Sequence, residues 1–415
     1  MTYMETLGAR AKTAAPAAAK AGVVLKNQAL NAIADALLVN SERIIAENAK
    51  DLEQAVQNNM TAAMQDRLRL DEGRIQAIAN AVRKLVALED PIGTEDKGWV
   101  RPNGLRIRQV RVPLGVIGII FESRPNVTVD AAALCLKAGN AVILRGGKEA
   151  ISSNTCLVSV MREALESVGL PADLVQLVEK TDRETAAEMM RLNSYLDVLI
   201  PRGGAGLIQA VVKQATVPVI ETGAGNCHVY VDASADLAMA VQIANNAKTQ
   251  RPSVCNAIET LLVHKDIAPA FLPHIRTAFS AHNVEIHGCA ETQRILGDGV
   301  IPATEEDYAT EYLDYKIAVC VVDSVEEAVA HIEKYSTRHS ECIVTKNMEN
   351  AEYFQNSVNS AAVYVNASTR FTDGEEFGFG AEIGISTQKL HARGPMGLLA
   401  LTTIQYRIIG NGQIR

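Results

Sequence analysis

The chain has 415 residues, 48% of them hydrophobic and 21% charged, which suffices for a large core and excludes collagen-like, disordered and mini-protein classes. Its formal net charge of −8 argues against a general nucleic-acid or anionic-membrane binder. No apolar stretch reaches the roughly 18 residues of a membrane span. Seven cysteines without C-x-x-C spacing indicate a reducing cytoplasm, with neither a disulfide framework nor a structural zinc site.

The first ninety residues are predicted to be helical, because apolar residues recur at three- and four-residue steps. From residue 98 to 112, apolar and basic residues nearly alternate, which predicts a two-stranded ribbon that turns at Pro102-Asn103-Gly104. Near the end of the chain, residues 398–409 are again typical of a strand, and we expect this strand to cross to a partner.

An alternation of apolar strands and helices fills the middle of the chain. The first set of predicted strands lies near 115–121, 141–144, 174–178, 197–200 and 217–220. The second set lies near 228–232, 258–263, 317–322, 342–345 and 361–365. Continuously apolar strands joined by helical crossovers indicate parallel sheets covered on both faces. The predicted fold is therefore α/β, with two doubly wound Rossmann-like domains that meet near 222–228.

Two glycine-rich turns are candidates for binding a nucleotide phosphate. Gly203 and Gly204 follow a predicted strand and open a helix, where free N–H groups and the helix dipole attract anions. Such turns also use glycine for steric reasons alone. Arg145 and Lys148 belong to a second turn, which lacks the glycine spacing and the Ser or Thr of a P-loop. A kinase or ATPase is therefore disfavoured.

Cys255 is the candidate nucleophile among the seven thiols. It lies in a polar loop before a predicted strand, where exposure and the neighbouring Arg251 would lower its pKa. The roles of Cys227 and Cys289 are left open. The other four cysteines lie on apolar faces of predicted helices or strands, where cysteine acts as a small hydrophobic residue. Glu221 ends a predicted strand at the edge where α/β proteins bind ligands, although it is equally explained as a capped surface acid. The eight histidines lack metal-ligand spacing, so we expect no metal site.

Several motifs occur together in one order along the chain. These are Pro125-Asn126, the Arg145 turn, Glu221-Thr222-Gly223, and Cys255 at a separation of 255 − 221 = 34 residues from the glutamate. Longer matching stretches lie at 121–128, 328–343, 365–371 and 380–395. On these residues the chain resembles the aldehyde dehydrogenase superfamily, and within it the branch that reduces an acyl phosphate.

The resemblance implies a division of the chain into three parts. Residues 1–97, 113–224 and 371–397 would form an NADPH-binding domain, and 225–370 a catalytic domain. Residues 98–112 and 398–415 would form a small β oligomerisation arm. The resemblance therefore implies a homo-oligomer of at least two copies.

The resemblance also implies a reaction, the NADPH-dependent reduction of L-glutamyl 5-phosphate to L-glutamate 5-semialdehyde and phosphate, the second step of proline biosynthesis. Cys255 would form a thioester, and Asn126 with the backbone N–H of Cys255 would hold the oxyanion. Glu221 would deprotonate the thiol or serve only the reverse reaction. Glu311 matches the glutamate that holds the nicotinamide ribose.

Departures from ordinary aldehyde dehydrogenases refine the expected ligands. Arg124-Pro125 replaces a tryptophan and Arg145-Gly146 a Lys-Pro turn, and added cationic charge suits an acyl phosphate. Lys148 stands where many NAD-preferring relatives carry glutamate, so the expected cofactor is NADPH. The candidates for the substrate α-carboxylate are Ser368, Thr369 and Arg370, while Arg124 is the candidate for the substrate phosphate.

Three alternatives remain open on the sequence. The first is another aldehyde dehydrogenase-like enzyme, acylating or oxidising. The second is a cofactor-free hydrolase that uses Cys255 and Glu221, and the third is a nucleotide-binding regulatory module without catalysis. Expected partners are the small acyl phosphate and the glutamate kinase that supplies it, with no nucleic acid and no membrane.

Overall fold

The computed structural model describes residues 1–415 except Ala63 and Ala205, and the chain forms two compact units. Unit 1 comprises Met1–Glu221, Gly378–Gly384 and Met396–Arg415, and unit 2 comprises Thr222–Phe377 and Ile385–Pro395. The boundary expected near 222–228 thus falls at Thr222. The segment 371–397, expected in the cofactor domain, is divided: 371–377 and 385–395 belong to unit 2, because backbone bonds such as Gly223 N–H to Ile385 O (3.0 Å) hold them there.

Unit 1 is built on a four-stranded parallel sheet with the order β5-β4-β3-β6. Its central strand β3 is completely buried because all its residues are apolar or glycine. The strand predicted at 217–220 is reduced to a single bridge between Leu199 and Val219. The strands are β3 (Val116–Phe121), β4 (Ala141–Arg145), β5 (Val175–Leu177) and β6 (Val198–Arg202).

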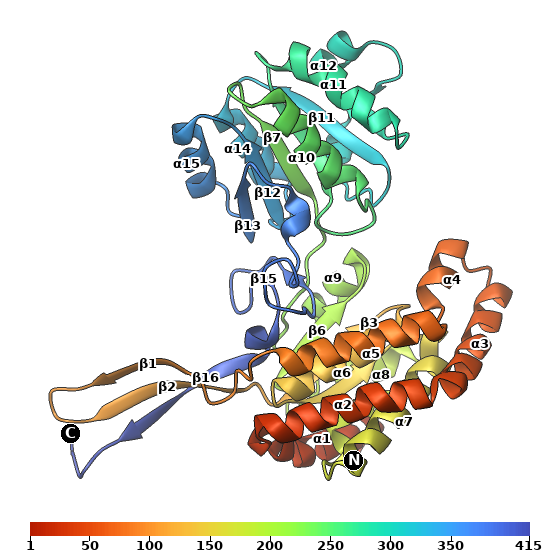
Figure 1. Cartoon of the computed structure of the whole chain (residues 1–415), viewed down its shortest axis with the longest axis vertical. Helices are drawn as coiled ribbons and strands as arrows, with labels where there is room; N and C mark the ends of the chain where they lie inside the picture. Colours follow the sequence, from red (N-terminus) through yellow and green to blue (C-terminus); the bar gives the residue numbers. More distant parts are fainter. The chain divides into compact units, whose positions relative to one another are not determined.

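Helices cover both faces of this sheet (Figure 1). The right-handed crossovers place α6 and α7 on one face, where α2, α3 and α5 pack over them, while α1 contacts β3, β4 and α8. These helices are α1 (Tyr3–Lys20), α2 (Val23–Val39), α3 (Ser41–Gln57), α4 (Ala62–Leu68), α5 (Glu72–Ala87), α6 (Pro125–Lys137), α7 (Ile151–Ser167), α8 (Arg183–Met190) and α9 (Ala205–Gln214). None of the helices described in the chain is long and apolar enough to cross a membrane.

A three-stranded antiparallel arm extends from unit 1, with the order β1-β2-β16. Its strands are β1 (Glu95–Val100), β2 (Arg106–Pro113) and β16 (Thr402–Ile409). The sequence predicted only two strands and a tail that crosses to a partner. The tail instead pairs along the whole of β2, which satisfies backbone groups that would otherwise be unpaired. Gly104 takes φ +88° in the turn, a conformation that favours glycine.

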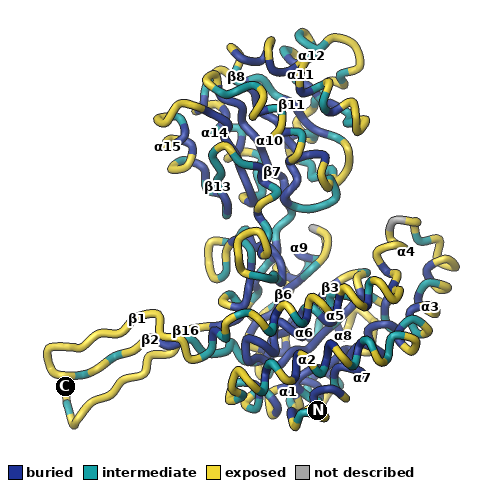
Figure 2. Tube along the Cα trace, in the orientation of Figure 1, coloured by how far each residue is buried: buried dark blue, intermediate teal, exposed yellow. Residues whose placement is uncertain are grey.

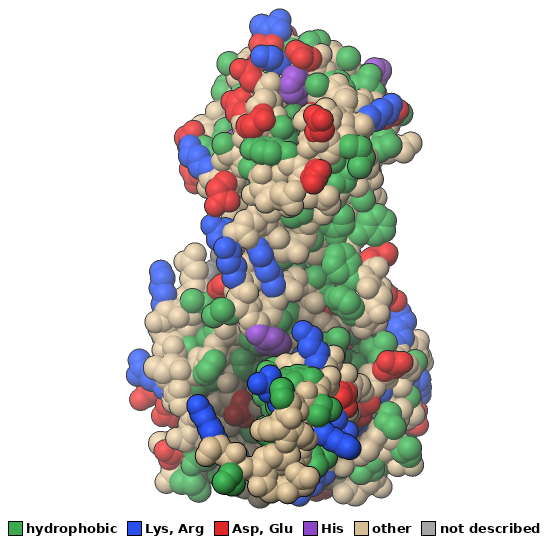
Figure 3. All heavy atoms as spheres, turned by 90° about the vertical axis from the view of Figure 1, so that its left-hand side faces the viewer, with side chains coloured by type: hydrophobic (Ala, Val, Ile, Leu, Met, Phe, Trp, Pro, Cys, Tyr) green, Lys and Arg blue, Asp and Glu red, His purple; other side chains and the backbone are tan. Residues whose placement is uncertain are grey.

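The arm exposes apolar side chains. Figure 2 shows that most of the arm is exposed, and Figure 3 looks onto the side from which it projects, where basic and hydrophobic side chains are mixed. Trp99 and Tyr406 pack edge to face across β2 with ring centroids 6.3 Å apart. Among the described residues, no further strand pairs with the outer edges of β1 and β16.

Unit 2 contains a seven-stranded parallel sheet with the order β10-β9-β11-β8-β7-β12-β13. Its strands are β7 (Cys227–Val231), β8 (Ile258–His264), β9 (Glu285–Gly288), β10 (Ile301–Pro302), β11 (Lys316–Val322), β12 (Ser340–Val344) and β13 (Ala362–Val365). The sequence did not predict β9 and β10, because both are short and partly or fully exposed.

The faces of this sheet are covered by two apolar clusters. The helices of unit 2 are α10 (Leu237–Thr249), α11 (Ala268–Ser280), α12 (Ala290–Leu296), α13 (Glu305–Ala309), α14 (Val325–Tyr335) and α15 (Met348–Ser357). A two-stranded pairing of β14 (Ile385–Ser386) with β15 (Gly394–Pro395) completes the unit. Short 3₁₀ turns lie at η1 (Lys148–Ala150), η2 (Ala172–Leu174), η3 (Thr369–Phe371) and η4 (Leu398–Leu401).

Candidate active site

In unit 2, Cys255 lies in the turn between α10 and β8 and is half-buried. The turn is closed by a bond from Ala257 N–H to Val254 O (3.1 Å). Because β7 and β8 are parallel neighbours and Cys227 pairs with Ile258, the turn lies at the amino ends of these strands. The rule that α/β ligands bind at carboxyl ends therefore does not locate this thiol.

Residues of η3 support the Cys255 turn from one side. Thr369 is fully buried and its hydroxyl donates to Asn256 O (2.7 Å), while the Asn256 amide donates to Thr372 O (3.0 Å). Ser368 is 6% exposed, and its hydroxyl accepts the N–H of Arg370 (3.3 Å). These two hydroxyls were predicted to meet the substrate. In the structure they cap η3 and anchor the turn, and their role toward the substrate stays a prediction.

Arg370 is a half-buried cation whose charge acts on the Cys255 thiol. Its Nε donates to Gln250 Oε1 (2.8 Å). Burial lowers the pKa of Arg370 below its ordinary value, the charge of Arg251 lowers it further, and Asp373 and Cys255 oppose this shift. A guanidinium at such a position favours the ionised form of a neighbouring thiol.

Glu311 is held by the backbone of the chain that precedes β7. Its carboxylate accepts the N–H of Gly225 (2.7 Å), and burial raises its pKa above the ordinary value. Gly225 in turn lies against the backbone of Cys255, since a Cβ at this position would be 1.5 Å from the carbonyl oxygen of Cys255. The structure thus brings Glu311, Gly225 and the Cys255 turn together.

Cys227, which the sequence left open, supports the same turn. Its thiol is fully buried and donates to the carbonyl oxygen of Cys255 (3.1 Å), and the His339 ring nitrogen Nδ1 lies 3.6 Å from its sulfur. Burial raises the pKa of Cys227 well above its ordinary value. In the structure Cys227 therefore acts as a buried hydrogen-bond donor to the Cys255 turn.

In unit 1, Asn126 lies in the first turn of α6, which begins with Pro125. The Asn126 amide donates one hydrogen bond to Asp130 Oδ2 (3.0 Å). Burial raises the pKa of Asp130 to about 6. Because the amide has two hydrogens, this contact orients Asn126 and leaves a second N–H for another acceptor. The sequence analysis missed Asp130, although the i, i+4 spacing on a helix was a usable signal.

The Gly203-Gly204 turn already binds a negatively charged group of the chain. The N–H of Gly204 donates to Glu122 Oε2 (2.9 Å), and a Cβ on Gly203 would lie 2.4 Å from that oxygen. The N-cap residue of α9 is Gly204, which has no side chain with which to cap the helix. The turn can therefore hold an anionic oxygen, as a cofactor phosphate would require.

The second glycine-rich turn contains two cations, Arg145 and Lys148, which differ in whether they are hydrogen-bonded within the chain. Arg145 donates to the carbonyl oxygens of Thr181 (3.2 Å) and Asp182 (3.1 Å), ahead of α8. Lys148 is exposed and forms no ion pair among the described residues. Its neighbour Glu149 instead accepts the N–H and the hydroxyl of Ser123 (2.8 and 2.6 Å). Lys148 is thus the cation of this turn that can meet an incoming anion.

The other two predicted residues of unit 1 lie at the ends of secondary elements. Glu221 is half-buried and follows Ile220, whose N–H bonds Leu199 O (3.0 Å) beside β6. Arg124 is exposed and precedes α6 without capping it through its side chain.

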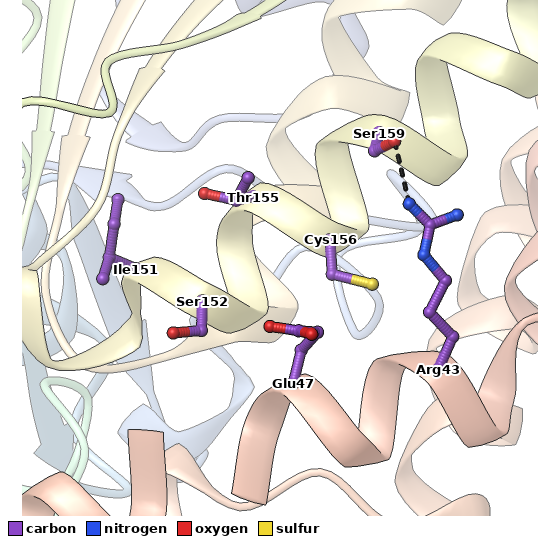
Figure 4. A pocket seen from close by; sticks show the side chains of 7 residues that line it. All are labelled: Arg43, Glu47, Ile151, Ser152, Thr155, Cys156 and Ser159. Carbon is purple, nitrogen blue, oxygen red and sulfur yellow. Dashed lines mark hydrogen bonds between the residues drawn. The ribbon is translucent and has the colours of Figure 1, made fainter. Parts of the chain in front are cut away.

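A pocket of about 360 Å³ lies between α3 and α7 of unit 1 (Figure 4). Arg43 crosses its rim and donates to the hydroxyl of Ser159 (3.2 Å). The lining is completed by Glu47, Ile151, Ser152, Thr155 and Cys156. None of the predicted site residues lines this pocket.

The two α/β units and the half-buried Cys255 are compatible with an aldehyde dehydrogenase-type oxidoreductase, and comparison with known proteins shows that the chain is of this class. The model of the aldehyde dehydrogenase family matches residues 2–294. An acetylating aldehyde dehydrogenase from Geobacillus thermoglucosidasius shares the fold with a TM-score of 0.71 at 18% identity, covering 99% of this chain and 97% of its own.

Closer similarity is found among gamma-glutamyl phosphate reductases. That of Clostridium novyi is 60% identical over 413 residues, covering 100% of this chain and 99% of the relative. The crystal structure of the Thermotoga maritima reductase superposes with a TM-score of 0.98 at 50% identity, covering 100% of both chains. The chain belongs to the gamma-glutamyl phosphate reductases of the aldehyde dehydrogenase family. This confirms the predicted fold class and resemblance, and the family implies a nicotinamide cofactor.

Proposed function

We propose that the protein catalyses the NADPH-dependent reduction of L-glutamyl 5-phosphate to L-glutamate 5-semialdehyde and phosphate, the second step of proline biosynthesis. The observation that carries this proposal is the built turn of the half-buried Cys255, in which the Cys227 thiol donates to Cys255 O (3.1 Å) and the Thr369 hydroxyl donates to Asn256 O (2.7 Å). The substrate is taken from the names of relatives up to 60% identical over the full length.

Cys255 is the proposed nucleophile. Its thiolate attacks the acyl carbon, a C–S bond forms, and the C–O bond to phosphate breaks, so that phosphate leaves with the electron pair. The proposal assigns oxyanion stabilisation to the second N–H of Asn126 and to the backbone N–H of Cys255. Release of the aldehyde returns the sulfur as thiolate, which the positive charge of Arg370 favours. Glu221 would move a proton at the thiol, and Arg124 would meet the substrate phosphate.

A nicotinamide cofactor, when bound, supplies the hydride that reduces the thioester. The chain offers it three contacts: the Gly203-Gly204 turn for a phosphate, Lys148 for the 2′-phosphate, and Glu311 for the ribose. The turn suits this role because Gly204 N–H already donates to a carboxylate, that of Glu122. Arg145 is committed to two carbonyl oxygens, so its proposed role is to shape the turn.

The proposed reaction is tested in reverse, with L-glutamate 5-semialdehyde, phosphate and NADP. We expect NADP reduction that requires phosphate and is faster than with NAD. Turnover that is indifferent to phosphate would favour an oxidising aldehyde dehydrogenase, and hydrolysis without any cofactor would favour the cysteine hydrolase.

The Lys148→Glu variant is expected to weaken the preference for NADP over NAD by about tenfold, because an exposed attraction becomes a repulsion of similar size. The measurement is the ratio of kcat/KM for the two cofactors. Lys213→Glu, an exposed lysine at the end of α9, makes the same charge change and should leave the ratio unaltered. An unaltered ratio in Lys148→Glu as well would remove Lys148 from the cofactor site.

The arm leads us to propose that the protein is at least a dimer. It exposes apolar side chains on β16, including Ile404, Tyr406 and Ile408, and keeps unpaired strand edges that another chain could cover. Light scattering of the whole protein is expected to give at least twice the 44.6 kDa mass of the chain. A monomer at micromolar concentration would contradict this.

We also propose that the enzyme lies in the cytoplasm and that a glutamate kinase supplies its substrate.

A further inference from the structure

Unit 2 buries an ion pair that the proposed chemistry does not use. Lys248 Nζ lies 2.5 Å from Glu259 Oε2, and both side chains are 0% exposed. Removing two charges from water costs several kcal/mol each, and apolar replacements of a buried pair are often as stable. A buried pair is therefore weak evidence for a stabilising role. The position of this pair in the fold indicates a different role.

The pair closes the base of the nucleophile turn. Lys248 lies in the last turn of α10, and Glu259 is the second residue of β8. The Cys255 turn is the connection between these two elements. The contact between Lys248 and Glu259 thus fixes both ends of the segment that presents the thiol.

The same carboxylate reaches the loop that carries Glu311. Its other oxygen, Oε1, accepts the N–H of Leu313 (3.2 Å), and Leu313 has φ +54°, a left-handed conformation that is costly for a non-glycine residue. Lys248 Nζ also lies 5.9 Å from the centre of the Tyr312 ring. The pair therefore holds the backbone two residues after Glu311 in an otherwise unfavourable conformation.

Together with a second set of contacts, the ion pair connects the Cys255 turn and the Glu311 loop at two places. Glu311 accepts the N–H of Gly225, and Gly225 lies directly against the backbone of Cys255. Cys255 is followed four residues later by Glu259. The Glu259 carboxylate accepts the N–H of Leu313, which lies two residues after Glu311. A shift of either loop would be transmitted to the other.

We propose that Lys248 and Glu259 are a positioning pair that sets the Cys255 turn and the Glu311 loop in one fixed relation. The proposal rests on the proposed function for the roles of Cys255 and Glu311. Burial raises the pKa of Glu259 and lowers that of Lys248, and the charge of each residue opposes the shift of the other. Asp314 and Cys227 also raise the pKa of Lys248, and Glu311 raises that of Glu259.

The test compares two double variants of the full-length protein. Lys248→Met/Glu259→Met removes both charges and the acceptor for Leu313, whereas Lys248→Met/Glu259→Gln keeps an amide oxygen that can accept that N–H. The control is Lys26→Met/Asp90→Met in unit 1, an ion pair (2.9 Å) with side chains 2% and 13% exposed, whose carboxylate also accepts a backbone N–H, that of Ile92 (3.0 Å).

Three quantities are measured: Tm, kcat in the reverse assay, and the rate at which iodoacetamide alkylates Cys255 without cofactor. We expect the Met/Met variant to lose about tenfold or more in kcat and alkylation rate at a Tm close to that of the control, since small misplacements cost such factors. The Met/Gln variant should recover part of both rates and protect the Leu313 amide from hydrogen exchange.

The proposal is overturned if the Met/Met variant matches the control in kcat and alkylation rate, which is the result expected of a merely structural pair. If the Met/Met variant does not fold, the Met/Gln variant is compared with the control instead. The comparison then uses kcat, the alkylation rate of Cys255 and the hydrogen exchange of the Leu313 amide. Phosphate-dependent turnover in Cys255→Ser would instead refute the proposed function, and the exchange measurement would still test the pair.

Discussion

Replacing Cys255 by serine is expected to reduce phosphate-dependent NADP reduction by about a thousandfold or more, because removal of a covalent nucleophile has effects of this size. A serine hydroxyl is not ionised at neutral pH, so the charge of Arg370 cannot activate it as it would a thiolate. The measurement is kcat with saturating L-glutamate 5-semialdehyde, phosphate and NADP. Binding of NADPH, followed by its fluorescence, should be nearly unchanged.

A second half-buried thiol provides the control. The pKa of Cys289 is lowered to about 5, chiefly by its contact with Cys320 and also by bonds from Thr292 and the N–H of Val321. By ionisation alone, Cys289 would be the more reactive thiol. We expect Cys289→Ser to keep at least half of the wild-type kcat, because no predicted substrate or cofactor residue touches this cysteine. Loss of turnover in Cys289→Ser with retention in Cys255→Ser would reverse our assignment of the nucleophile.

Replacing Gly225 by alanine is expected to lower kcat by about a hundredfold, the factor that a misplacement of about 1 Å can cost. The added Cβ would lie 1.5 Å from the carbonyl oxygen of Cys255 and 2.6 Å from its Cα. These are backbone atoms and cannot rotate away, so the whole turn must move. The same shift would disturb the bond from Gly225 N–H to Glu311 (2.7 Å), so KM for NADP should rise as well.

Gly73→Ala is the matched control for Gly225→Ala. Its Cβ would meet only Asp71 Oδ1 at 3.4 Å, an ordinary contact, within the first turn of α5. The measurements are kcat, KM and Tm of both variants. A Gly225→Ala variant with wild-type kcat would show that the position of the Cys255 backbone does not govern the reaction.

The amino-acid sequence was sufficient to predict the fold class, which the structure confirms, and to name candidate site residues. Continuously apolar segments predicted most strands of both sheets, because a strand that is covered on two faces has no polar side. The apolar pattern overpredicted a strand at 217–220, where the structure has a single bridge, and it missed the short strands β9 and β10, whose few and partly exposed residues leave no such pattern. Cys255 was predicted from its polar loop and Asn126 from the family resemblance, and both roles stay predictions.

Only the tertiary structure decided how these residues are supported. Asp130 orients Asn126, Cys227 donates to Cys255 O, and Thr369 anchors Asn256. Apart from the helical pair Asn126 and Asp130, the partners are separated by 28 to 113 residues, and no local pattern connects them. The tail also became a third strand of the arm, because β2 has a free edge to pair. Local periodicity reports which face of an element is buried, whereas hydrogen-bond partners distant in sequence are fixed only when the sheets pack.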